Sequence, residues 1–370
     1  MRYYIIAGEA SGDLHASNLI RALKELDSKA EFRGWGGDRM MNNGAVIVKH
    51  YRDLAFMGFA EVISNLKTIL SNLSYCKKDI LEYKPDAVIL IDYPGFNLRI
   101  ASFLHKQGIK VIYYISPQVW AWKKSRVKII KKVVDKLLVI LPFEKEFFRK
   151  HGVEAEFTGH PLLDAISETA SSVTFKERQK RVVALLPGSR KQEIKKVLPL
   201  MLSVIPDFKD VTFIIAGVNS IPKSFYQEII QDNPIEIEFN NTYKLLMKSN
   251  AALVTSGTAT LETALFDVPE VVCYKGSWLS YTIARQLVKV KYISLVNLIM
   301  DRPVVKELIQ SDLNKKNLKR ELDQLLGNTE YKNQMLLEFN DLKEMLGGIG
   351  ASHRAAMSIN QFLTAKENIH

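Results

Sequence analysis

Short apolar runs alternate along the chain with longer amphipathic segments, and this alternation is its main structural signal. The run "AVILI" at 87–91 is continuously apolar, as expected of a parallel strand that is buried on both faces. Patterns of this kind predict both strands and helices in the first half of the chain. The predicted strands lie at 3–7, 31–35, 87–91, 110–115 and 136–141, and the predicted helices at 17–26 and 67–83.

The same alternation restarts after residue 180. Strands are predicted at 182–186, 211–216, 251–255 and 271–274, and a helix at 191–205. The polar stretch 167–180 is the best linker between the two series, and the tail from 313 onward is helical with breaks at Gly347, Gly348 and Gly350. We therefore predict an α/β protein with two Rossmann-like, doubly wound domains, 1–166 and 181–345. A C-terminal helix at 346–370 is expected to pack on the first domain or on a partner subunit.

Composition narrows the class of protein. Hydrophobic residues make up 47% of the 370 positions and charged residues 25%, which is typical of a globular chain. The two cysteines, Cys76 and Cys273, are too few for a disulfide framework and favour a reducing compartment. No stretch approaches the length of a membrane span, and the first apolar run is too short for a signal peptide. The net charge of +11 suits an anionic partner: nucleic acid, acidic lipid or a phosphorylated substrate.

A glycine between two hydroxyls, Ser256-Gly257-Thr258, stands where a predicted strand becomes a helix. Free backbone amides at a helix N-terminus bind anions. Glu262, one turn later on the same helix face, would repel a phosphate and therefore needs a different partner. A nucleotide offers both partners, a diphosphate and a ribose diol. The alternative is a surface glutamate that the helix dipole favours.

A second loop of this kind, "LLPGSRKQEI", contains Gly188, Ser189 and Arg190. Ser189 can cap the following helix, and Arg190 offers a bidentate charge for phosphate oxygens. Alternatively, Ser189 only caps the helix and Arg190 is solvated. Two phosphate-type loops in one domain favour a nucleotide site. In doubly wound sheets ligands bind beyond the carboxyl ends of the strands, and with two domains the cleft between them is the expected site.

The first domain offers a candidate base. Asp92 directly follows the buried strand 87–91, where a carboxylate faces the ligand edge of the sheet. We expect its pKa to be ordinary, which leaves it ionised at pH 7. The alternative is an aspartate that caps the loop. The first loop, with Gly8, Glu9, Ser11 and Gly12, is not a G-x-G-x-x-G motif, so a nicotinamide site is weakly supported and a tight turn is the simpler interpretation.

Two segments suggest contact with a membrane surface. The stretch 51–70 contains an apolar cluster of Phe56, Met57, Phe59, Val62 and Ile63. A later basic stretch, "VWAWKKSRVKIIKKVVDK", contains Trp120 and Trp122 beside lysines and arginines, a combination that suits an anionic membrane interface. The alternatives are a core helix and a solvated helix face. No nucleic-acid-binding module accompanies the basic segment, no histidines pair at metal-ligand spacing, and there is no D-x-D motif, so we expect neither nucleic acid nor metal.

Taken together, the motifs resemble one family. "AGEASGDLHA", "LAFMGFAEV", "IDYPGFN", "SPQVWAWKKSRV", "LPFEKEFF", "TGHP", "LPGSRKQEI", "SGTATLETAL" and "KYISLVNLI" are similar in order and spacing to lipid-A-disaccharide synthases. The resemblance implies an inverting glycosyltransferase of the two-domain GT-B architecture. Such an enzyme joins UDP-2,3-diacylglucosamine to 2,3-diacylglucosamine 1-phosphate (lipid X), forms a β(1→6) disaccharide and releases UDP. It needs no metal or other cofactor, and it works in lipid A synthesis on the anionic phospholipid of the cytoplasmic face of the inner membrane in Gram-negative bacteria.

The resemblance also assigns residues. It implies that Ser256, Gly257 and Thr258 approach the UDP phosphates, that Glu262 meets the ribose and that Asp92 is the base. Asn297 of the "SLVN" segment would join the UDP-sugar site. The sequence departs from the family pattern at three positions, Gly95, Val296 and Glu270.

Other functions fit parts of the same pattern. One alternative is another GT-B enzyme of UDP-sugars, such as a UDP-N-acetylglucosamine transferase or a 2-epimerase, which would not need the apolar patch at 56–63. Another is a non-catalytic protein that binds anionic membranes, in which Asp92, Arg190 and Glu262 would tolerate alanine. The oligomeric state stays open, a homodimer included.

Overall fold

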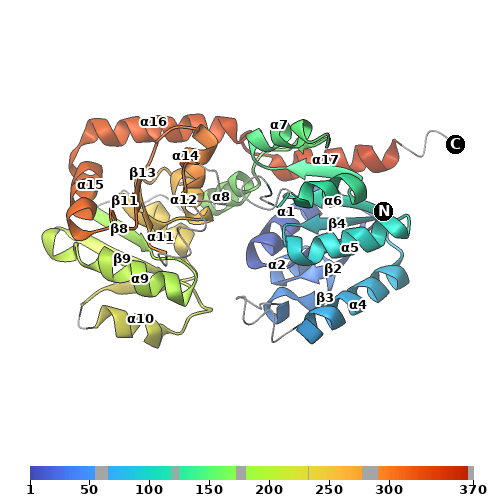
Figure 1. Cartoon of the computed structure of the whole chain (residues 1–370), viewed down its shortest axis with the longest axis horizontal. Helices are drawn as coiled ribbons and strands as arrows, with labels where there is room; N and C mark the ends of the chain where they lie inside the picture. The colour runs from blue at the N-terminus through green and yellow to red at the C-terminus, as the bar shows by residue number, and fades with distance from the viewer. Residues whose placement is uncertain are drawn as a thin grey trace. The chain divides into compact units, whose positions relative to one another are not determined.

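The computed structural model describes residues 1–54, 66–117, 119, 125–171, 181–231, 233–276 and 291–365. Its internal contacts divide the chain into two units. Unit 1 is Met1–Ala165 with Leu346–His370, and unit 2 is Ile166–Met345. Each unit is built on one parallel sheet, of seven strands in unit 1 and of six in unit 2 (Figure 1).

The sheet of unit 1 has the strand order β3-β2-β1-β4-β5-β6-β7. Its strands are β1 (Arg2–Ala7), β2 (Glu31–Gly36), β3 (Ala45–His50), β4 (Ala87–Ile91), β5 (Lys110–Tyr114), β6 (Lys136–Val139) and β7 (Glu156–Phe157). Its helices are α1 (Ala10–Leu26), α2 (Asp38–Asn42), the 3-10 turn η1 (Tyr51–Leu54), α4 (Leu66–Tyr83), α5 (Pro94–Lys106), α6 (Ser125–Val133), α7 (Pro142–Lys150) and α17 (Ala351–Thr364). Helix α8 (Leu162–Ser171) begins in unit 1 and ends in unit 2.

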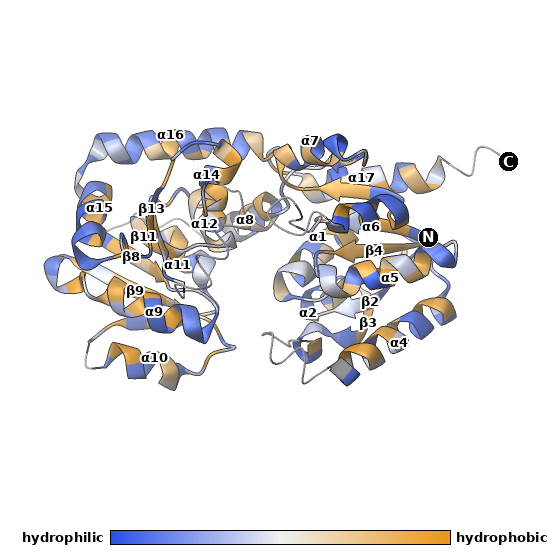
Figure 2. Cartoon of the chain, viewed as in Figure 1, coloured by the Kyte–Doolittle hydropathy of each residue, from blue (hydrophilic) through white to orange (hydrophobic). Residues whose placement is uncertain are grey.

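Helices cover both faces of this sheet. Helices α4, α5 and α6 share one hydrophobic core with strand residues such as Tyr4, Val88 and Tyr113. Helices α1 and α17 share the other core with the alternate strand residues, such as Ile89 and Tyr114. Because side chains on both faces are buried, the central strand β4 is apolar throughout, and it is orange in Figure 2.

Two buried or partly buried charges fix the start of α17. The carboxylate of Asp164 accepts hydrogen bonds from the backbone N–H groups of Gly350 and Ser352 at 2.6 and 2.8 Å. Arg354 donates to the carbonyl oxygens of Thr158 and Gly347, both at 2.8 Å. The C-terminal helix therefore lies on α1 within unit 1, which is one of the two positions that the sequence left open.

The sheet of unit 2 has the order β10-β9-β8-β11-β12-β13. Its strands are β8 (Arg181–Leu186), β9 (Val211–Gly217), β10 (Glu236–Phe239), β11 (Ala251–Thr255), β12 (Glu270–Tyr274) and β13 (Lys306–Ile309). Its helices are α9 (Lys191–Leu202), the 3-10 turn η2 (Ile205–Asp207), α10 (Lys223–Ile230), α11 (Thr242–Lys248), α12 (Thr258–Leu265), α14 (Leu295–Met300), α15 (Lys315–Gly327) and α16 (Thr329–Met345). Among the described residues of both units, no helix combines the length and apolar character needed to span a bilayer.

The predicted fold class, two doubly wound parallel sheets, is confirmed. Three boundaries differ from the prediction by three residues or more. Helix α1 begins at Ala10 instead of residue 17, because polar residues in its first turns, such as Asp13, are buried and used by the fold. Helix α9 ends at Leu202 rather than at 205, where a 3-10 turn follows. The predicted linker at 167–180 begins as helix, since α8 continues to Ser171.

Candidate active site

The turn after β4 is strained at the residue that the sequence marks as a base. Asp92 and Tyr93 have φ values of 42° and 47°, in the left-handed region that side chains other than glycine avoid. Each such residue costs about 1–2 kcal/mol. Helix α5 then begins at Pro94, which suits the first helical position. We call Asp92-Tyr93 with Pro94 the Asp92 turn.

Buried side chains hold this turn. The carbonyl oxygen of Asp92 accepts hydrogen bonds from the Tyr113 hydroxyl at 2.7 Å and from Nδ2 of Asn97 at 2.8 Å. The backbone N–H of Asp92 donates to the carbonyl oxygen of Ile115 at 3.2 Å. Sequence reasoning missed both Asn97 and Tyr113. An asparagine five residues after the aspartate was the available signal for the first, and nothing in the sequence marks the second.

The Asp92 carboxyl group is an unusual acid. Burial, and then the negative charge of Glu9, raise its pKa to about 6, against a smaller lowering by the backbone N–H of Tyr93. The expectation of an ordinary pKa is therefore wrong. The group is still mostly ionised at pH 7, and it is a stronger base than a solvated aspartate.

The first loop lies against the Asp92 turn. A side-chain carbon at Gly8 would come within 2.5 Å of the Tyr93 ring, so the ring covers the backbone there. Gly12 is buried against Ala7, while Glu9 and Ser11 are exposed. Only Glu9 and Ser11 therefore present side chains to a ligand.

Asp13, in the first turn of α1, binds backbone amides of the protein itself. Its buried carboxylate accepts hydrogen bonds from the backbone N–H groups of Gly37 at 2.7 Å, Arg39 at 3.1 Å and Met40 at 3.2 Å. These are the free amides at the start of α2, so Asp13 caps that helix from a distance in sequence. Its role is structural.

In unit 2 the turn between β11 and α12 is open. Gly257 has φ 156° and ψ −161°, a conformation essentially restricted to glycine, and among the described residues no atom beyond its chain neighbours lies within 4 Å of the position that a side-chain carbon would take. No side chain caps α12, and Gly257 and Thr258 are exposed. The Ser256 hydroxyl donates to the carbonyl oxygen of Ile293 at 2.8 Å. The first amides of α12 are thus arranged as an anion site requires.

The loop after β8 lies next to it, since β8 and β11 are neighbouring strands. Gly188 has φ 108°, and an added carbon there would meet Glu193 at 2.8 Å and Thr255 at 3.6 Å. Helix α9 begins at Lys191 with Arg190 as its N-cap and no capping side chain, so the expected cap by Ser189 is wrong. The Arg190 guanidinium pairs with Glu193 at 2.7 Å but remains 66% exposed, which leaves donors for a phosphate.

Glu262 of α12 is held by a tyrosine. The Tyr243 hydroxyl donates to Oε1 of Glu262 at 3.1 Å. Burial raises the pKa of Glu262 to about 7, although the hydrogen bond from Tyr243 opposes the rise. The carboxyl is therefore a desolvated acceptor that lies one turn beyond the open amides, as the sequence analysis expected for a group that binds a diol.

The side-chain amide of Asn297 is hydrogen-bonded within the protein. Its Nδ2 donates to the carbonyl oxygen of Val305 at 2.9 Å and to Glu307 at 3.0 Å, and its Oδ1 accepts from the backbone N–H of Val305 at 2.9 Å. Glu307, which sequence reasoning missed, also accepts from the backbone N–H groups of Ile293 and Ser294. The contacts of Asn297 favour a role in shaping the segment that Ser256 touches.

The three departures from the family pattern lie in different environments. Gly95 is exposed, and in the part of the chain that the structure describes no atom lies within 4 Å of the position of an added carbon. Val296 is fully buried in α14. Glu270 is fully buried in β12, and neither carboxyl oxygen has a hydrogen-bond partner among the described residues.

The expected membrane-contact residues lie outside the described residues: Phe56, Met57, Phe59, Val62, Ile63, Trp120 and Trp122.

Known proteins with this fold include enzymes of nucleotide sugars. The UDP-GlcNAc 2-epimerase of Neisseria meningitidis, solved with UDP-GlcNAc, has a TM-score of 0.71 and 14% identity and covers 98% of this chain and 100% of its own. The glycosyltransferase of kitacinnamycin has a TM-score of 0.65 and 12% identity, with 98% of each chain covered. At these identities the likeness shows the GT-B-like fold alone.

Sequence comparison is more specific. Residues 3–358 match the family model described as lipid-A-disaccharide synthetase. The lipid-A-disaccharide synthase of Syntrophus aciditrophicus is 41% identical over 365 residues, 95% of each chain. That of Geobacter sulfurreducens is 35% identical over 373 residues, 98% of this chain and 97% of its own. The chain therefore belongs to the lipid-A-disaccharide synthase family of glycosyltransferases.

Proposed function

We propose that this chain transfers 2,3-diacylglucosamine from UDP-2,3-diacylglucosamine to the 6-hydroxyl of 2,3-diacylglucosamine 1-phosphate, with inversion and without a metal ion. The Asp92 carboxylate takes the proton of the 6-hydroxyl as its oxygen bonds to C1 of the donor sugar. The bond from C1 to the diphosphate oxygen breaks, and UDP leaves with the electron pair. The products are the β(1→6) disaccharide 1-phosphate and UDP.

The Asp92 turn carries this proposal. A strained turn that persists at the carboxyl end of a strand is a common feature of catalytic sites. Here it presents a carboxyl group with a pKa of about 6, which suits a general base near neutral pH. Glu9, whose charge acts on Asp92, is the next residue to test if the base lies elsewhere.

The donor nucleotide is assigned to unit 2. The open amides at Gly257 and Thr258, the loop at Gly188 and Ser189 and the exposed charge of Arg190 supply positive potential for a diphosphate. These groups would stabilise the leaving UDP without a cation. Glu262 would accept hydrogen bonds from the ribose hydroxyls.

The assay for this function uses the purified full chain with both acylated substrates in EDTA. The expected products are UDP and a disaccharide 1-phosphate whose anomeric proton coupling shows the β configuration. Release of UDP without a disaccharide, or a requirement for a divalent cation, would contradict the proposal. Conversion of UDP-GlcNAc to its 2-epimer would favour the epimerase alternative instead.

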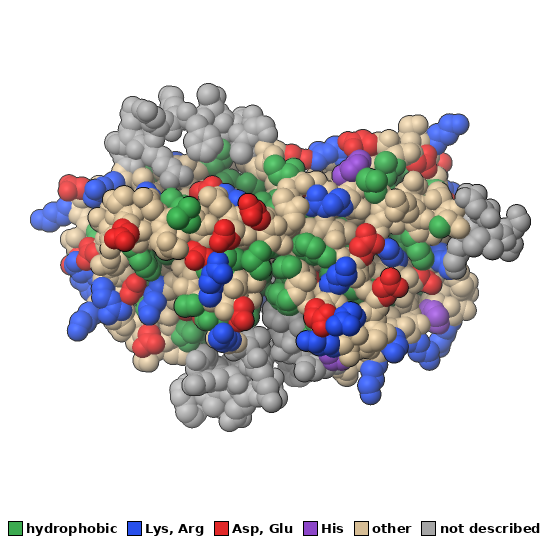
Figure 3. Space-filling view, turned by 90° about the horizontal axis from the view of Figure 1, so that it is seen from above, with side chains coloured by type: hydrophobic (Ala, Val, Ile, Leu, Met, Phe, Trp, Pro, Cys, Tyr) green, Lys and Arg blue, Asp and Glu red, His purple; other side chains and the backbone are tan. Residues whose placement is uncertain are grey.

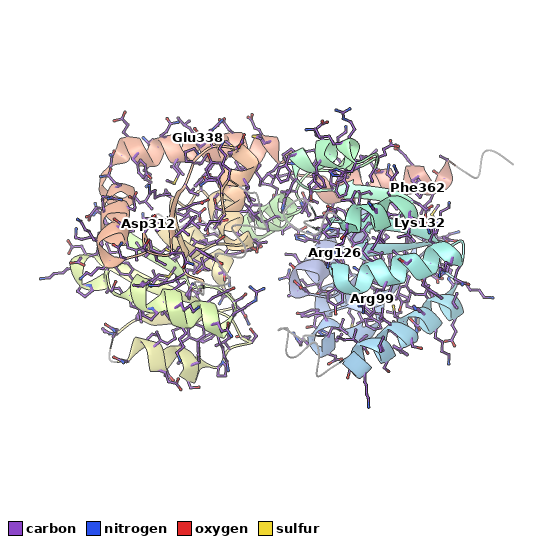
Figure 4. The ribbon with its side chains drawn as sticks, viewed as in Figure 1. Arg99, Arg126, Lys132, Asp312, Glu338 and Phe362 are labelled. Atoms are coloured by element: carbon purple, nitrogen blue, oxygen red, sulfur yellow. The ribbon has the colours of Figure 1, made fainter. Side chains whose placement is uncertain are left out.

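The chain is further proposed to act at an anionic membrane surface through unit 1. Helices α5 and α6 contain no Asp or Glu, and no ion pair joins their lysines and arginines to a described residue. Figure 4 labels three of these cations, Arg99 on α5 and Arg126 and Lys132 on α6. Ile129 of α6 and Leu70 of α4 are exposed beside them, and both helices pack on α5. By contrast, acidic and basic side chains are interspersed on the face seen in Figure 3.

Vesicle flotation tests this surface. The protein should bind vesicles that contain anionic phospholipid, and salt should weaken the cationic part of the binding. Replacing Lys128, Lys131 and Lys132 with glutamine should release the protein, because each cation near such a surface contributes about 1 kcal/mol. Replacing Lys306, Lys315 and Lys316 of unit 2 with glutamine is the matched control, because these three lysines are also exposed. Equal loss in both variants would mean that binding follows net charge rather than this surface.

A further inference from the structure

Asn97 and Tyr113 are buried side chains from two different elements, α5 and β5, that meet at one atom. Both donate hydrogen bonds to the carbonyl oxygen of Asp92, at 2.8 and 2.7 Å. Neither has any exposed surface. A carbonyl oxygen has two lone pairs, so these two donors saturate it.

The strain at this place extends to the neighbouring strand. Ile115, which directly follows β5, has φ 63°, and a left-handed conformation is a genuine outlier for a β-branched residue. Its carbonyl oxygen accepts the backbone N–H of Asp92, and its own N–H donates to Leu138 at 3.2 Å. Two adjacent strand ends are therefore strained and tied to each other. Strain of this kind persists only where the surrounding structure determines the backbone completely.

The side-chain amide of Asn97 makes hydrogen bonds with described residues only through its nitrogen. Its amide nitrogen donates to Asp92 and also to the carbonyl oxygen of Ile91 at 3.2 Å. Its Oδ1 is buried without a hydrogen-bond partner among the described residues. A buried acceptor without a partner is unfavourable. The hydrogen bonds that the Asn97 amide nitrogen donates must therefore offset the cost of burying its oxygen. Those donors act on the last residue of β4 and the first residue of the turn.

The arrangement determines where the Asp92 side chain points. With its carbonyl oxygen turned toward Asn97 and Tyr113 and its N–H toward Ile115, the main chain of Asp92 has no freedom left, and its Cβ direction follows. We propose that Asn97 and Tyr113 are positioning residues of the transferase, which hold the Asp92 carboxylate in the partly desolvated place beside Glu9 where it accepts the proton of the acceptor hydroxyl. This inference rests on the proposed role of Asp92 as the base.

Tyr113→Phe tests the inference because it removes one hydroxyl and keeps the ring. We expect kcat to fall about 10–100-fold, since small misplacements of a reacting group have effects of this size, while the affinity for UDP stays unchanged. A carboxylate released toward solvent becomes a more ordinary acid, so the acid limb of the pH profile of kcat should move to lower pH. Tyr114→Phe is the matched control: it is the next residue of β5, equally buried, and packs on the other face of the sheet. It should leave kcat and the pH profile unchanged.

Asn97→Ala should show the same kinetic signature, and if that variant does not fold, Tyr113→Phe decides alone. Wild-type kcat and pH profile in Tyr113→Phe, with at most a lower Tm, would overturn the inference and leave Asp92 as the base. Near-normal turnover in Asp92→Asn would instead remove the base itself, which separates failure of the proposed function from failure of this inference.

Discussion

The two units solve the same geometric problem, a turn from a strand into a helix at the carboxyl edge of a sheet, in opposite ways. In unit 1 the Asp92 turn uses left-handed residues that carry large side chains, and buried groups from α5 and β5 hold it. In unit 2 the turn at Gly257 uses a glycine, and a side-chain carbon added there would meet no atom of the described residues within 4 Å. The first turn presents a side chain, and the second presents backbone.

The difference follows from the chemistry proposed for each. A base acts through a side chain, so its residue cannot be glycine, and the strain of the turn has to be offset by hydrogen bonds elsewhere. A phosphate is bound by amides that must approach it closely, which a side chain would prevent. Substitutions of the Asp92 side chain in unit 1 and of residues that leave the backbone amides accessible in unit 2 therefore test this difference.

The largest effect is expected from Asp92→Asn, which keeps the size of the side chain and removes its basicity. Turnover should fall by roughly 10²–10⁴-fold, the usual contribution of a general base. The affinity for UDP should remain, since the nucleotide is assigned to unit 2. Turnover and calorimetric titration with UDP check both expectations, and a parallel loss of UDP binding would contradict the division of roles between the units.

Gly257→Ala tests the opposite device. The new carbon would contact none of the described residues beyond its chain neighbours, but it forces a conformation that is unfavourable by about 1–3 kcal/mol and narrows the approach to the amides. UDP binding should weaken about 10–100-fold.

Arg190→Ala should weaken UDP binding by a similar factor, because it removes a charge that contributes about 1.5–3 kcal/mol.

Gly327→Ala, at the end of α15, is the control for the glycine substitution, because an added carbon there also lies more than 4 Å from the other described residues. It should leave UDP binding unchanged. If Gly257→Ala binds UDP as the wild type does, the open turn is not the phosphate site.

Two glutamates of unit 2, the half-buried Glu262 and the fully buried Glu270, extend the comparison from turns to carboxyl groups. Glu262 has Tyr243 as a partner, whereas burial raises the pKa of Glu270 far above its usual range without a described hydrogen bond. A carboxyl whose pKa is higher in the folded than in the unfolded chain stabilises the fold less and less as pH rises above about 4.3. Glu270→Met should therefore raise the free energy of unfolding at pH 7 by about 1–3 kcal/mol and flatten its decline with pH.

Urea unfolding of unit 2 between pH 5 and pH 8 measures this effect. Glu236→Met, an exposed glutamate on strand β10, is the matched control and should change stability by no more than about 0.5 kcal/mol. A Glu270→Met protein with wild-type stability and the wild-type pH slope would show that the buried carboxyl is satisfied in solution.

The smallest effect concerns the pH dependence of UDP binding. If ribose hydroxyls donate to Glu262, UDP prefers the ionised form, and its affinity should rise about tenfold from pH 6 to pH 8 around the pKa of about 7. Glu262→Gln should remove this component and weaken binding. UDP titrates its own terminal phosphate in both experiments, so the difference between the two profiles reports Glu262. Parallel profiles would exclude the ribose contact.

The fold was largely predictable, and the misses have a common cause. The apolar runs of β4 and β11 gave the observed bounds, because central parallel strands are buried on both faces. The strands absent from the prediction are β3, β7, β10 and β13, which are the edge strands of the two sheets. All four strands are partly exposed, and β7, β10 and β13 have four residues or fewer, so their apolar pattern is weak.

The sequence by itself determined the class of the protein, its family and the local devices: glycines where strands turn into helices, an aspartate after a buried strand and a glutamate one turn into α12. Each of these features is contained in a few consecutive residues, and hydrophobic periodicity and turn residues can be recognised over that length. Tertiary structure decided which of them have partners. Tyr113 is 21 residues from Asp92, Tyr243 is 19 from Glu262, and Asp13 is 24 from Gly37. The side chains that hold the Asp92 turn, donate to Glu262 or cap a distant helix are brought together only by strand order and burial, which no local pattern contains.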